Sequence, residues 1–156
     1  MKKINLLFVC LGNICRSPMA EFVMRDLVFK AHLSDTIATA SCGTSGWHDG
    51  EYMHKGTQRL LQQHHITPQP FVSSRLSENA LSQYDYIAVM DDNNLRDVER
   101  ILGRNPQRIF KLTDFIDDFD FVPDPWYSGN FEECFDIIYR CCEKWLKVIK
   151  KSHNVA

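Results

Sequence analysis

Short apolar runs alternate along the chain with longer stretches in which apolar residues recur at helical spacing. The run from Ile4 to Val9 stops abruptly, which is typical of a buried strand in a parallel sheet. After Ser17 the spacing changes to three and four residues, which predicts a helix with one apolar face. Ser17 suits the N-cap of this helix, Pro18 its first position and Glu21 its first turn. The apolar positions of the helix are Ala20, Val23, Met24, Leu27, Val28 and Ala31.

The same alternation continues to the end of the chain. Further strands are predicted at residues 36–41, 86–90 and 108–112, and further helices at residues 56–64, 94–102 and 131–149. The last helix has the clearest apolar stripe, formed by Phe131, Cys134, Phe135, Ile138, Cys142, Trp145, Leu146 and Ile149. Strands that alternate with helices indicate the α/β class, with a parallel sheet covered by helices on both faces.

Length and composition limit the organisation of the protein. With 156 residues, 44% of them hydrophobic, the chain can bury a core without a metal or a disulfide. No repeat, linker or low-complexity tract divides it, so we expect one domain over residues 1–156. The formal net charge of −2 argues against a nucleic-acid-binding protein with a broad basic face. No apolar run approaches the roughly 18 residues that span a bilayer, so we expect no membrane insertion.

The cysteines favour a reduced, cytoplasmic protein. The chain has six cysteines, and none has the Cys-x-x-Cys spacing of a zinc site. The apolar stretch before Cys10 is shorter than the roughly 7–15 residues of a secretory signal core. The aspartates at positions 114, 117, 118 and 120 do not have the spacing of a calcium loop. We therefore expect neither a metal nor a cofactor.

The segment between the first strand and the first helix, CLGNICRSP at positions 10–18, has the residue types needed to bind and attack a phosphate. A loop that leads into a helix N-terminus presents backbone amides to an anion, at the sheet edge where α/β proteins bind ligands. Gly12 and Asn13 tolerate the left-handed backbone that a tight loop requires. The planar guanidinium of Arg16 can hold two phosphate oxygens. The amide dipoles and Arg16 favour the thiolate form of Cys10, which makes it a nucleophile.

This segment, with its flanks from Val9 to Glu21, resembles the signature of the low-molecular-weight protein tyrosine phosphatases. Three further segments resemble that family in order and spacing: Ser41 with residues 44–47, then residues 90–97, and then residues 124–127. The resemblance covers nearly the whole chain. It implies a four-stranded parallel sheet flanked by helices, of the flavodoxin-like type. It also implies hydrolysis of phosphotyrosine in protein substrates, and of small aryl phosphates, through a phosphocysteine.

The resemblance implies a role for each catalytic residue. Cys10 would attack phosphorus while Arg16 and the loop amides hold the phosphate or a related oxyanion. Asp124 would protonate the leaving phenolate and then activate the water that hydrolyses the intermediate. Pro123 and Pro125 on either side of Asp124 predict an extended, rigid segment there.

The remaining residues of the expected site bind substrate or support the loop. Ser17 would hydrogen-bond the thiolate, Asn13 would brace the loop with Ser41 as a supporting residue, and Cys15 would form a reversible disulfide with Cys10. Trp47, Trp126 and Tyr127, with Leu11, would form a deep aromatic slot that suits phosphotyrosine better than phosphoserine. The full set of expected substrate-binding residues is Leu11, Gly12, Asn13, Ile14, Cys15, Ser17, Trp47, Trp126 and Tyr127.

One departure and three alternatives remain open. Many members of the family carry a histidine that hydrogen-bonds the serine matched here by Ser41, but Pro70 stands about where it would be. An arsenate reductase shares the Cys-x5-Arg-Ser motif but needs further cysteines in the middle of the chain, where none occurs between Cys42 and Cys134. A protein-arginine phosphatase would favour threonine in place of Ile14. A binding module without activity would not need an acid such as Asp124.

Overall fold

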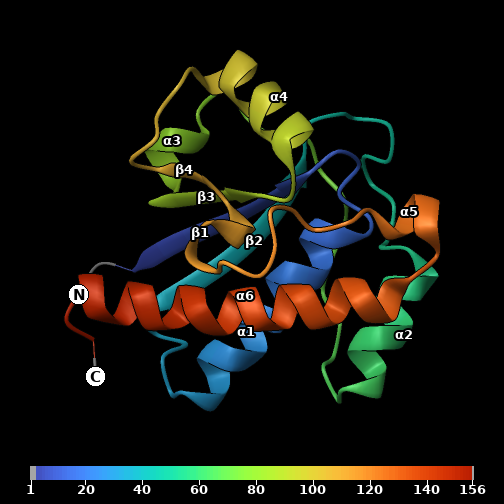
Figure 1. Cartoon of the computed structure of the whole chain (residues 1–156), viewed down its shortest axis with the longest axis horizontal. Helices are drawn as coiled ribbons and strands as arrows, with labels where there is room; N and C mark the ends of the chain where they lie inside the picture. The colour runs from blue at the N-terminus through green and yellow to red at the C-terminus, as the bar shows by residue number, and fades with distance from the viewer. Residues whose placement is uncertain (1–2, 156) are drawn as a thin grey trace.

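The computed structural model describes residues 3–155 and is built around a four-stranded parallel sheet (Figure 1). The strands are β1 (Ile4–Cys10), β2 (Ile37–Gly43), β3 (Tyr86–Val89) and β4 (Ile109–Lys111), in the spatial order β2-β1-β3-β4. Strand β1 is central, and its register with β2 runs from the pair Ile4 and Ile37 to the pair Cys10 and Gly43. The carboxyl ends of these two strands therefore meet at one edge of the sheet.

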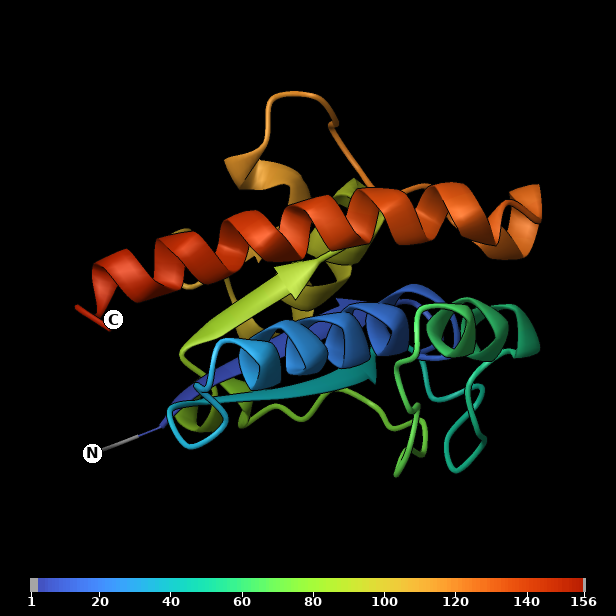
Figure 2. The same ribbon diagram turned by 90° about the horizontal axis from the view of Figure 1, so that it is seen from below.

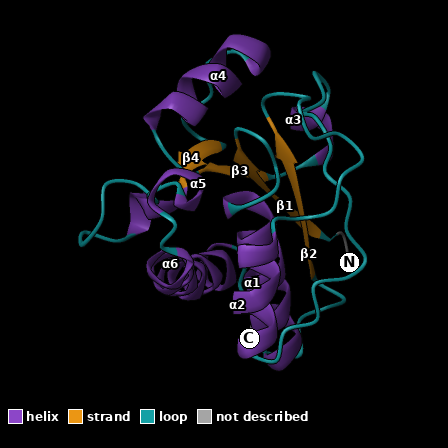
Figure 3. Cartoon of the chain, turned by 90° about the vertical axis from the view of Figure 1, so that its right-hand side faces the viewer, coloured by secondary structure: helices purple, strands orange, loops and turns teal. Residues whose placement is uncertain are grey.

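Helices cover both faces of the sheet, which confirms the predicted fold class. Helices α1, α2 and α6 lie on one face, and α3 and α4 lie on the other (Figure 3). Their bounds are α1 (Arg16–Lys30), α2 (Lys55–Gln63), α3 (Ala80–Gln83), α4 (Asp92–Leu102) and α6 (Phe131–Ser152). The short 3₁₀ helix η1 (Leu112–Phe115) and the single turn α5 (Pro125–Ser128) lie between β4 and α6.

The alternation of side chains along β1 divides the core into two clusters. Leu6 and Phe8 point to the face covered by α1 and α6, whereas Leu7 and Val9 point to the face covered by α3 and α4. All four side chains are buried because β1 is central and has helices on both sides. The sheet is thus a rigid support for the loop that follows Cys10.

Helix α1 begins earlier than the sequence pattern predicts. Its first residue is Arg16 and its N-cap is Cys15, with no side-chain cap. Ser17 and Pro18 are therefore inside the helix, and Glu21 lies beyond its first turn. The helix lies between α6 and strand β2 (Figure 2). The sequence pattern predicts one apolar face, but the buried surface of α1 is wider than that face. Residues 16–24 are all buried between the sheet, α2 and α6. The Ser17 hydroxyl is directed to Cys10 instead of capping the helix.

The other predicted elements are present, most of them within two residues of the expected bounds. The last helix is longer than predicted and continues to Ser152. Its predicted stripe is buried apart from Leu146, which is partly exposed, and Ile137 and Cys141 are buried as well. The sequence pattern missed α3, η1 and α5, which have four residues each. Within residues 3–155, no helix has both the length and the apolar character needed to cross a membrane.

Candidate active site

The loop of residues 11–15 joins β1 to α1 at the carboxyl edge of the sheet. Asn13 has φ of 57°, which is the left-handed conformation that its residue type tolerates. Gly12, for which the same was expected, does not have a positive φ. A Cβ at Gly12 would lie 3.0 Å from Cδ2 of His48, so a larger residue at this position would require the His48 ring to move. At Gly43 a Cβ would lie 2.8 Å from the carbonyl oxygen of Leu11, so the loop also needs a glycine on the neighbouring strand.

A cavity of about 140 Å³ opens above this loop. The three side chains expected to carry the chemistry, those of Cys10, Arg16 and Asp124, all line it. The other lining residues are Leu11, Gly12, Ile14, Cys15, Trp47, His48, Trp126 and Tyr127. Trp47 and Tyr127 are 75% and 81% exposed, so the aromatic wall stands at the mouth of the cavity and the reactive groups lie at its base.

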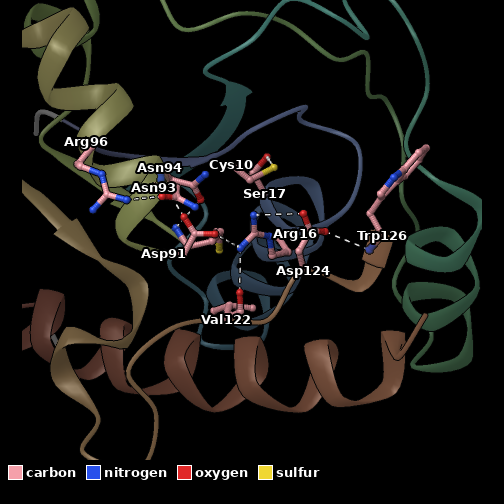
Figure 4. Close-up of polar contacts among 11 residues, drawn as sticks. Cys10, Arg16, Ser17, Asp91, Asn93, Asn94, Arg96, Val122, Asp124 and Trp126 are labelled. Carbon is pink, nitrogen blue, oxygen red and sulfur yellow. Dashed lines mark hydrogen bonds and ion pairs between the residues drawn. The ribbon is translucent and has the colours of Figure 1, made fainter. Parts of the chain in front are cut away.

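Arg16 is fixed by contacts from two loops far away in the sequence (Figure 4). Its Nη1 donates to Oδ2 of Asp91 at 2.7 Å and to the carbonyl oxygen of Val122 at 2.8 Å. Its Nη2 lies 3.6 Å from Oδ2 of Asp124. Burial disfavours the charged form, but Cys10 and the two aspartates raise the pKa of Arg16 above its ordinary value. The guanidinium is therefore a permanent cation at the base of the cavity.

Asp124 has the extended backbone that its two flanking prolines predict, with φ of −83° and ψ of 111°. Its Oδ1 accepts from the backbone N–H of Trp126 at 3.0 Å, which caps α5. Its Oδ2 is the oxygen nearest Arg16. The side chain is 25% exposed, so the carboxyl group faces both the cavity and the solvent. A group in this position can exchange protons with a bound ligand and with water.

A hydrogen-bonded network lies behind the nucleophile. The Oγ of Ser17 is 3.0 Å from the Sγ of Cys10. The Nδ2 of Asn13 donates to Oγ of Ser17 at 2.8 Å and to Oγ of Ser41 at 3.0 Å. Asn13 and Ser17 are fully buried and do not line the cavity. They hold the loop and the thiol, whereas a ligand would meet the side chains in front of them.

Glu21 is the partner of Ser41 in this network. Many members of the family have a histidine at this serine, and this chain lacks that histidine. Ser41 donates from its Oγ to Oε1 of Glu21 at 2.6 Å, and Nη2 of Arg25 lies 2.6 Å from Oε2. Burial raises the pKa of the Glu21 carboxyl, while Ser41 and Arg25 oppose this rise. The network therefore extends from Cys10 to a half-exposed arginine on α1.

All six cysteines are buried and none is paired in a disulfide. Cys15 lines the same cavity as Cys10. Burial raises the pKa of the Cys15 thiol strongly, and the charges of Cys10 and Asp124 add to this effect. Cys15 is therefore a neutral thiol beside the expected nucleophile. Burial likewise raises the pKa of Cys134, on α6, to about 12.

Sequence reasoning missed two residues of the site. His48 lines the cavity, and its Nδ1 lies 2.9 Å from Oε2 of Glu51. Its position next to Trp47 was the only signal in the sequence. Asp91 holds Arg16 and also caps α4, where its Oδ1 accepts from the N–H of Asn94 at 2.8 Å. Asp91 follows the predicted third strand by one position, so the rule that ligands bind beyond strand ends could have found it.

Within residues 3–155, no group of three or more His, Cys, Asp or Glu side chains is arranged to hold a metal ion. The cavity instead has a fixed cation and a thiol at its base, beside a loop that leads into the N-terminus of α1, which is the arrangement of an anion site.

Comparison of the sequence with known proteins identifies the family that this chain resembles. A model of the low molecular weight phosphotyrosine protein phosphatase family matches residues 5–155. The chain is 44% identical to the low molecular weight protein-tyrosine-phosphatase YfkJ of Bacillus subtilis, over 97% of this chain and 99% of that protein. It is 40% identical to the phosphatase PtpA of Staphylococcus epidermidis, over 97% of both chains.

Solved structures agree with this comparison. The crystal structure of YfkJ matches with a TM-score of 0.95 and 42% identity, over 97% of this chain and 98% of that chain. The crystal structure of DARP, a Drosophila arginine phosphatase, matches with a TM-score of 0.84 and 32% identity, over 93% and 97% of the two chains. Both similarities extend over nearly the whole of each chain.

Proposed function

The chain belongs to the low molecular weight phosphotyrosine protein phosphatase family, and on this premise we propose that Cys10, Arg16 and Asp124 carry out the hydrolysis of phosphotyrosine. The observation that carries the proposal is the cavity itself. One space of about 140 Å³ contains a thiol, a buried guanidinium and a carboxyl group, with aromatic side chains at its mouth. Binding a phosphate would require only the guanidinium and the backbone amides of the loop.

In the first step the Cys10 thiolate attacks phosphorus, and a bond forms between sulfur and phosphorus. The bond between phosphorus and the phenolic oxygen breaks, and Asp124 delivers its proton to that oxygen. The guanidinium of Arg16 and the amides of the loop hold the other phosphate oxygens, where negative charge is concentrated in the transition state. The products of this step are a phenol and a phosphocysteine.

In the second step Asp124, now a carboxylate, removes a proton from water. The oxygen of that water bonds to phosphorus, the bond to Cys10 breaks, and inorganic phosphate leaves. The thiolate and the protonated Asp124 are restored together. The partial exposure of Asp124 supports this step, because the carboxylate can reach solvent water.

The aromatic wall supports a preference for aryl phosphates in protein substrates. Trp47, Trp126 and Tyr127 are exposed at the mouth, while Cys10 is only 4% exposed at the base. A phosphotyrosine ring placed between these aromatic side chains positions its phosphorus at Cys10. Phosphoserine has a shorter side chain and would leave phosphorus above the loop.

The test of this proposal is hydrolysis by the purified chain and by the variant Cys10→Ser. The wild type is expected to hydrolyse p-nitrophenyl phosphate and a phosphotyrosine peptide steadily. The variant should still bind the peptide but show no turnover, because the hydroxyl of serine is a far weaker nucleophile at neutral pH. Turnover by Cys10→Ser would refute the nucleophile, and binding without hydrolysis by the wild type would indicate a binding module.

Two further substrates discriminate between the alternatives. Ile14 lines the cavity with an apolar side chain, which supports an aryl substrate over the polar guanidine of phosphoarginine. We therefore expect kcat/KM for a phosphotyrosine peptide to exceed that for a phosphoarginine peptide. The reverse order would indicate an arginine phosphatase, as DARP is. Reduction of arsenate coupled to thioredoxin is expected to be absent.

Cys15 is proposed to protect the nucleophile from irreversible oxidation. Peroxide converts the Cys10 thiolate to a sulfenic acid, which condenses with the Cys15 thiol to give a disulfide and water. An external thiol then reduces the disulfide. Both cysteines line one cavity, and the raised pKa of Cys15 keeps it protonated until it reacts. Peroxide inactivation should be reversed by dithiothreitol in the wild type but not in Cys15→Ala; equal recovery would contradict this role.

Such chemistry requires a reducing compartment, so we also propose that the protein acts in the cytoplasm on phosphotyrosine-containing proteins. The six unpaired, buried cysteines are consistent with this location. Fractionation of the cells that produce the protein tests it. A substrate-trapping experiment with Asp124→Ala would identify the partner proteins.

A further inference from the structure

The amide of Asn13 has only one orientation in the network behind Cys10. Its Oδ1 accepts from the backbone N–H of Ser74 at 3.0 Å, so its Nδ2 must face the two serines. An amide nitrogen carries two hydrogens and accepts none. One hydrogen therefore goes to Oγ of Ser17 and the other to Oγ of Ser41.

This orientation determines where each serine sends its own hydrogen. A hydroxyl group has one hydrogen, and both serine oxygens already accept from Asn13. Ser41 can donate to Oε1 of Glu21 at 2.6 Å. Ser17 can donate to Sγ of Cys10 at 3.0 Å or, over a longer distance, to the carbonyl oxygen of Cys42 at 3.3 Å. The network thus has a direction: Asn13 donates to both serines, and each serine donates onward to its own acceptor. Those acceptors are Glu21 for Ser41 and Cys10 for Ser17.

We propose that the Glu21 carboxylate is a positioning residue that sets this direction, so that Ser17 donates its hydrogen to the Cys10 thiolate. The inference rests on the proposed role of Cys10 as nucleophile. An ionised carboxylate only accepts hydrogen bonds, and Glu21 is 6% exposed, so its oxygens depend on Ser41 and Arg25 as donors. Without an acceptor at Glu21, the hydrogen of Ser41 would face the hydrogens of Asn13. The Asn13 amide would then shift and release Ser17.

The charged and titratable groups around the network are few. Those that act on Cys10 or its neighbouring thiols are Arg16, Asp124, Glu133, Cys15, Cys42 and Cys134. Glu21 contacts Arg25 on its own helix and Ser41 on β2. Its charge also acts on Tyr84, which precedes β3. Burial raises the pKa of Tyr84 and of the three surrounding thiols, so none of these four groups gains a charge near neutral pH.

The variant Glu21→Gln tests the direction of the network without changing its shape. If the amide oxygen of the glutamine faces Ser41, its NH₂ faces the donors of Arg25. If the glutamine is turned over, its NH₂ faces Ser41, which must then donate toward Asn13. Arg25 has only donors and needs an acceptor, so it favours the second orientation, which places donor against donor at Ser41 and reverses the network. Removal of Arg25 by Arg25→Met in the same chain relieves the first conflict, because the glutamine NH₂ then faces open space.

The measurement is the pH dependence of alkylation of Cys10 by iodoacetate, which reports the thiolate directly. Glu21→Gln is expected to move the alkylation midpoint upward by about one pH unit. At a fixed pH below the midpoint, this shift lowers the alkylation rate about tenfold. Loss of a nearby negative charge alone would move the midpoint downward, because it would favour the thiolate. The sign of the shift therefore separates the two effects.

Recovery in the double variant completes the test. In the double variant Glu21→Gln with Arg25→Met, the alkylation midpoint should return toward that of the Arg25→Met single variant. Below the midpoint, the reactivities of these two variants should agree within about threefold. Asp26→Asn is the matched control, because it breaks the next ion pair on α1, with Lys30, away from Ser41. Its midpoint should equal that of the wild type.

The proposal is overturned by an unchanged or lower midpoint in Glu21→Gln, or by a raised midpoint that the double variant does not restore. If thermal unfolding shows that Glu21→Gln does not fold, Ser41→Ala replaces it, because it removes the hydroxyl that links Asn13 to Glu21. An upward shift in Ser41→Ala supports the network and an unchanged midpoint overturns it. Turnover of p-nitrophenyl phosphate by the wild type is measured separately, so failure of the proposed function is distinguished from failure of this inference.

Discussion

Arg16 is held by polar contacts from parts of the chain that are distant in sequence. It comes from the first turn of α1, but its partners Asp91, Val122 and Asp124 come from loops after β3 and before α6. Two of these contacts hold one nitrogen, so the plane of the guanidinium is fixed before any ligand binds. Orientation of this kind contributes to catalysis because the phosphate finds the cation already in place.

Asp91→Asn tests whether this orientation matters. The change removes the charged partner of Arg16 but keeps an acceptor for the N-cap of α4. We expect kcat/KM for p-nitrophenyl phosphate to fall roughly 10- to 100-fold, with little change in the melting temperature. The matched control is Asp92→Asn, because Asp92 is 68% exposed and pairs with Lys111 instead. Equal activity of the two variants would contradict the role of Asp91.

Asp124→Asn tests the proton transfer from Asp124 to the leaving phenolic oxygen. Asparagine keeps an oxygen for the N–H of Trp126 but cannot donate a carboxylic proton. We expect kcat to fall about 10²- to 10⁴-fold with phenyl phosphate. The loss should be smaller with p-nitrophenyl phosphate, whose leaving group needs less protonation. An equal loss for both substrates would show that Asp124 does not protonate the leaving oxygen.

At the scale of elements, His54 links α2 to the catalytic loops. Its Nδ1 accepts from the N–H of Gly56 at 2.9 Å and so caps α2. Its backbone N–H donates to the carbonyl oxygen of Ile14, and its ring packs on Phe131 and against Trp126. Only the neutral imidazole can accept at Nδ1, so protonation of His54 would break the cap of α2.

The pH dependence of stability follows from this contact. Burial, with the charge of Arg59, lowers the pKa of His54 in the folded protein. The stabilisation is therefore present above the ordinary histidine pKa of about 6.5 and is lost as the pH falls through the lower folded value. We expect the melting temperature to fall between pH 7.5 and pH 5 less steeply in His54→Asn, which keeps a capping oxygen that does not titrate. Identical slopes would exclude His54 as a source of acid sensitivity.

At the scale of the whole molecule, stability and substrate binding depend on different aromatic residues. Trp145 is fully buried between α6 and the sheet, and its Nε1 donates to the carbonyl oxygen of Leu112 at 2.8 Å. Trp47 is 75% exposed at the mouth of the cavity. The core and the cavity wall are thus separate, as expected when a rigid scaffold carries functional loops.

Two tryptophan substitutions test this separation. Trp145→Ala should lower the free energy of unfolding by about 3–5 kcal/mol, because it leaves a large cavity and an unpaired carbonyl. Trp47→Ala should change that free energy by less than about 0.5 kcal/mol but raise KM for a phosphotyrosine peptide. Denaturant unfolding and steady-state kinetics check both expectations. A large stability loss in Trp47→Ala would show that the cavity wall is part of the core.

Much of the fold was predictable because its signals are local. The apolar run before Cys10 and the helical spacing after Ser17 depend on neighbouring residues, so strand, loop and helix were expected in the right order. The extended backbone at Asp124 was predictable for the same reason, since proline restricts the residue before it. The short helices α3, η1 and α5 were missed because four residues are too few to establish a period.

The sequence by itself determined the order of the elements and the loop that has Cys10 before it, at the end of β1, and Arg16 after it, at the start of α1. Only the tertiary structure decided which distant side chains complete the site. Asp91 meets Arg16 because β1 and β3 are neighbours in the sheet, and Glu21 meets Ser41 because α1 packs on β2. Such partners are chosen by burial and by the need to satisfy each enclosed polar group, and these conditions arise only when separate elements pack together.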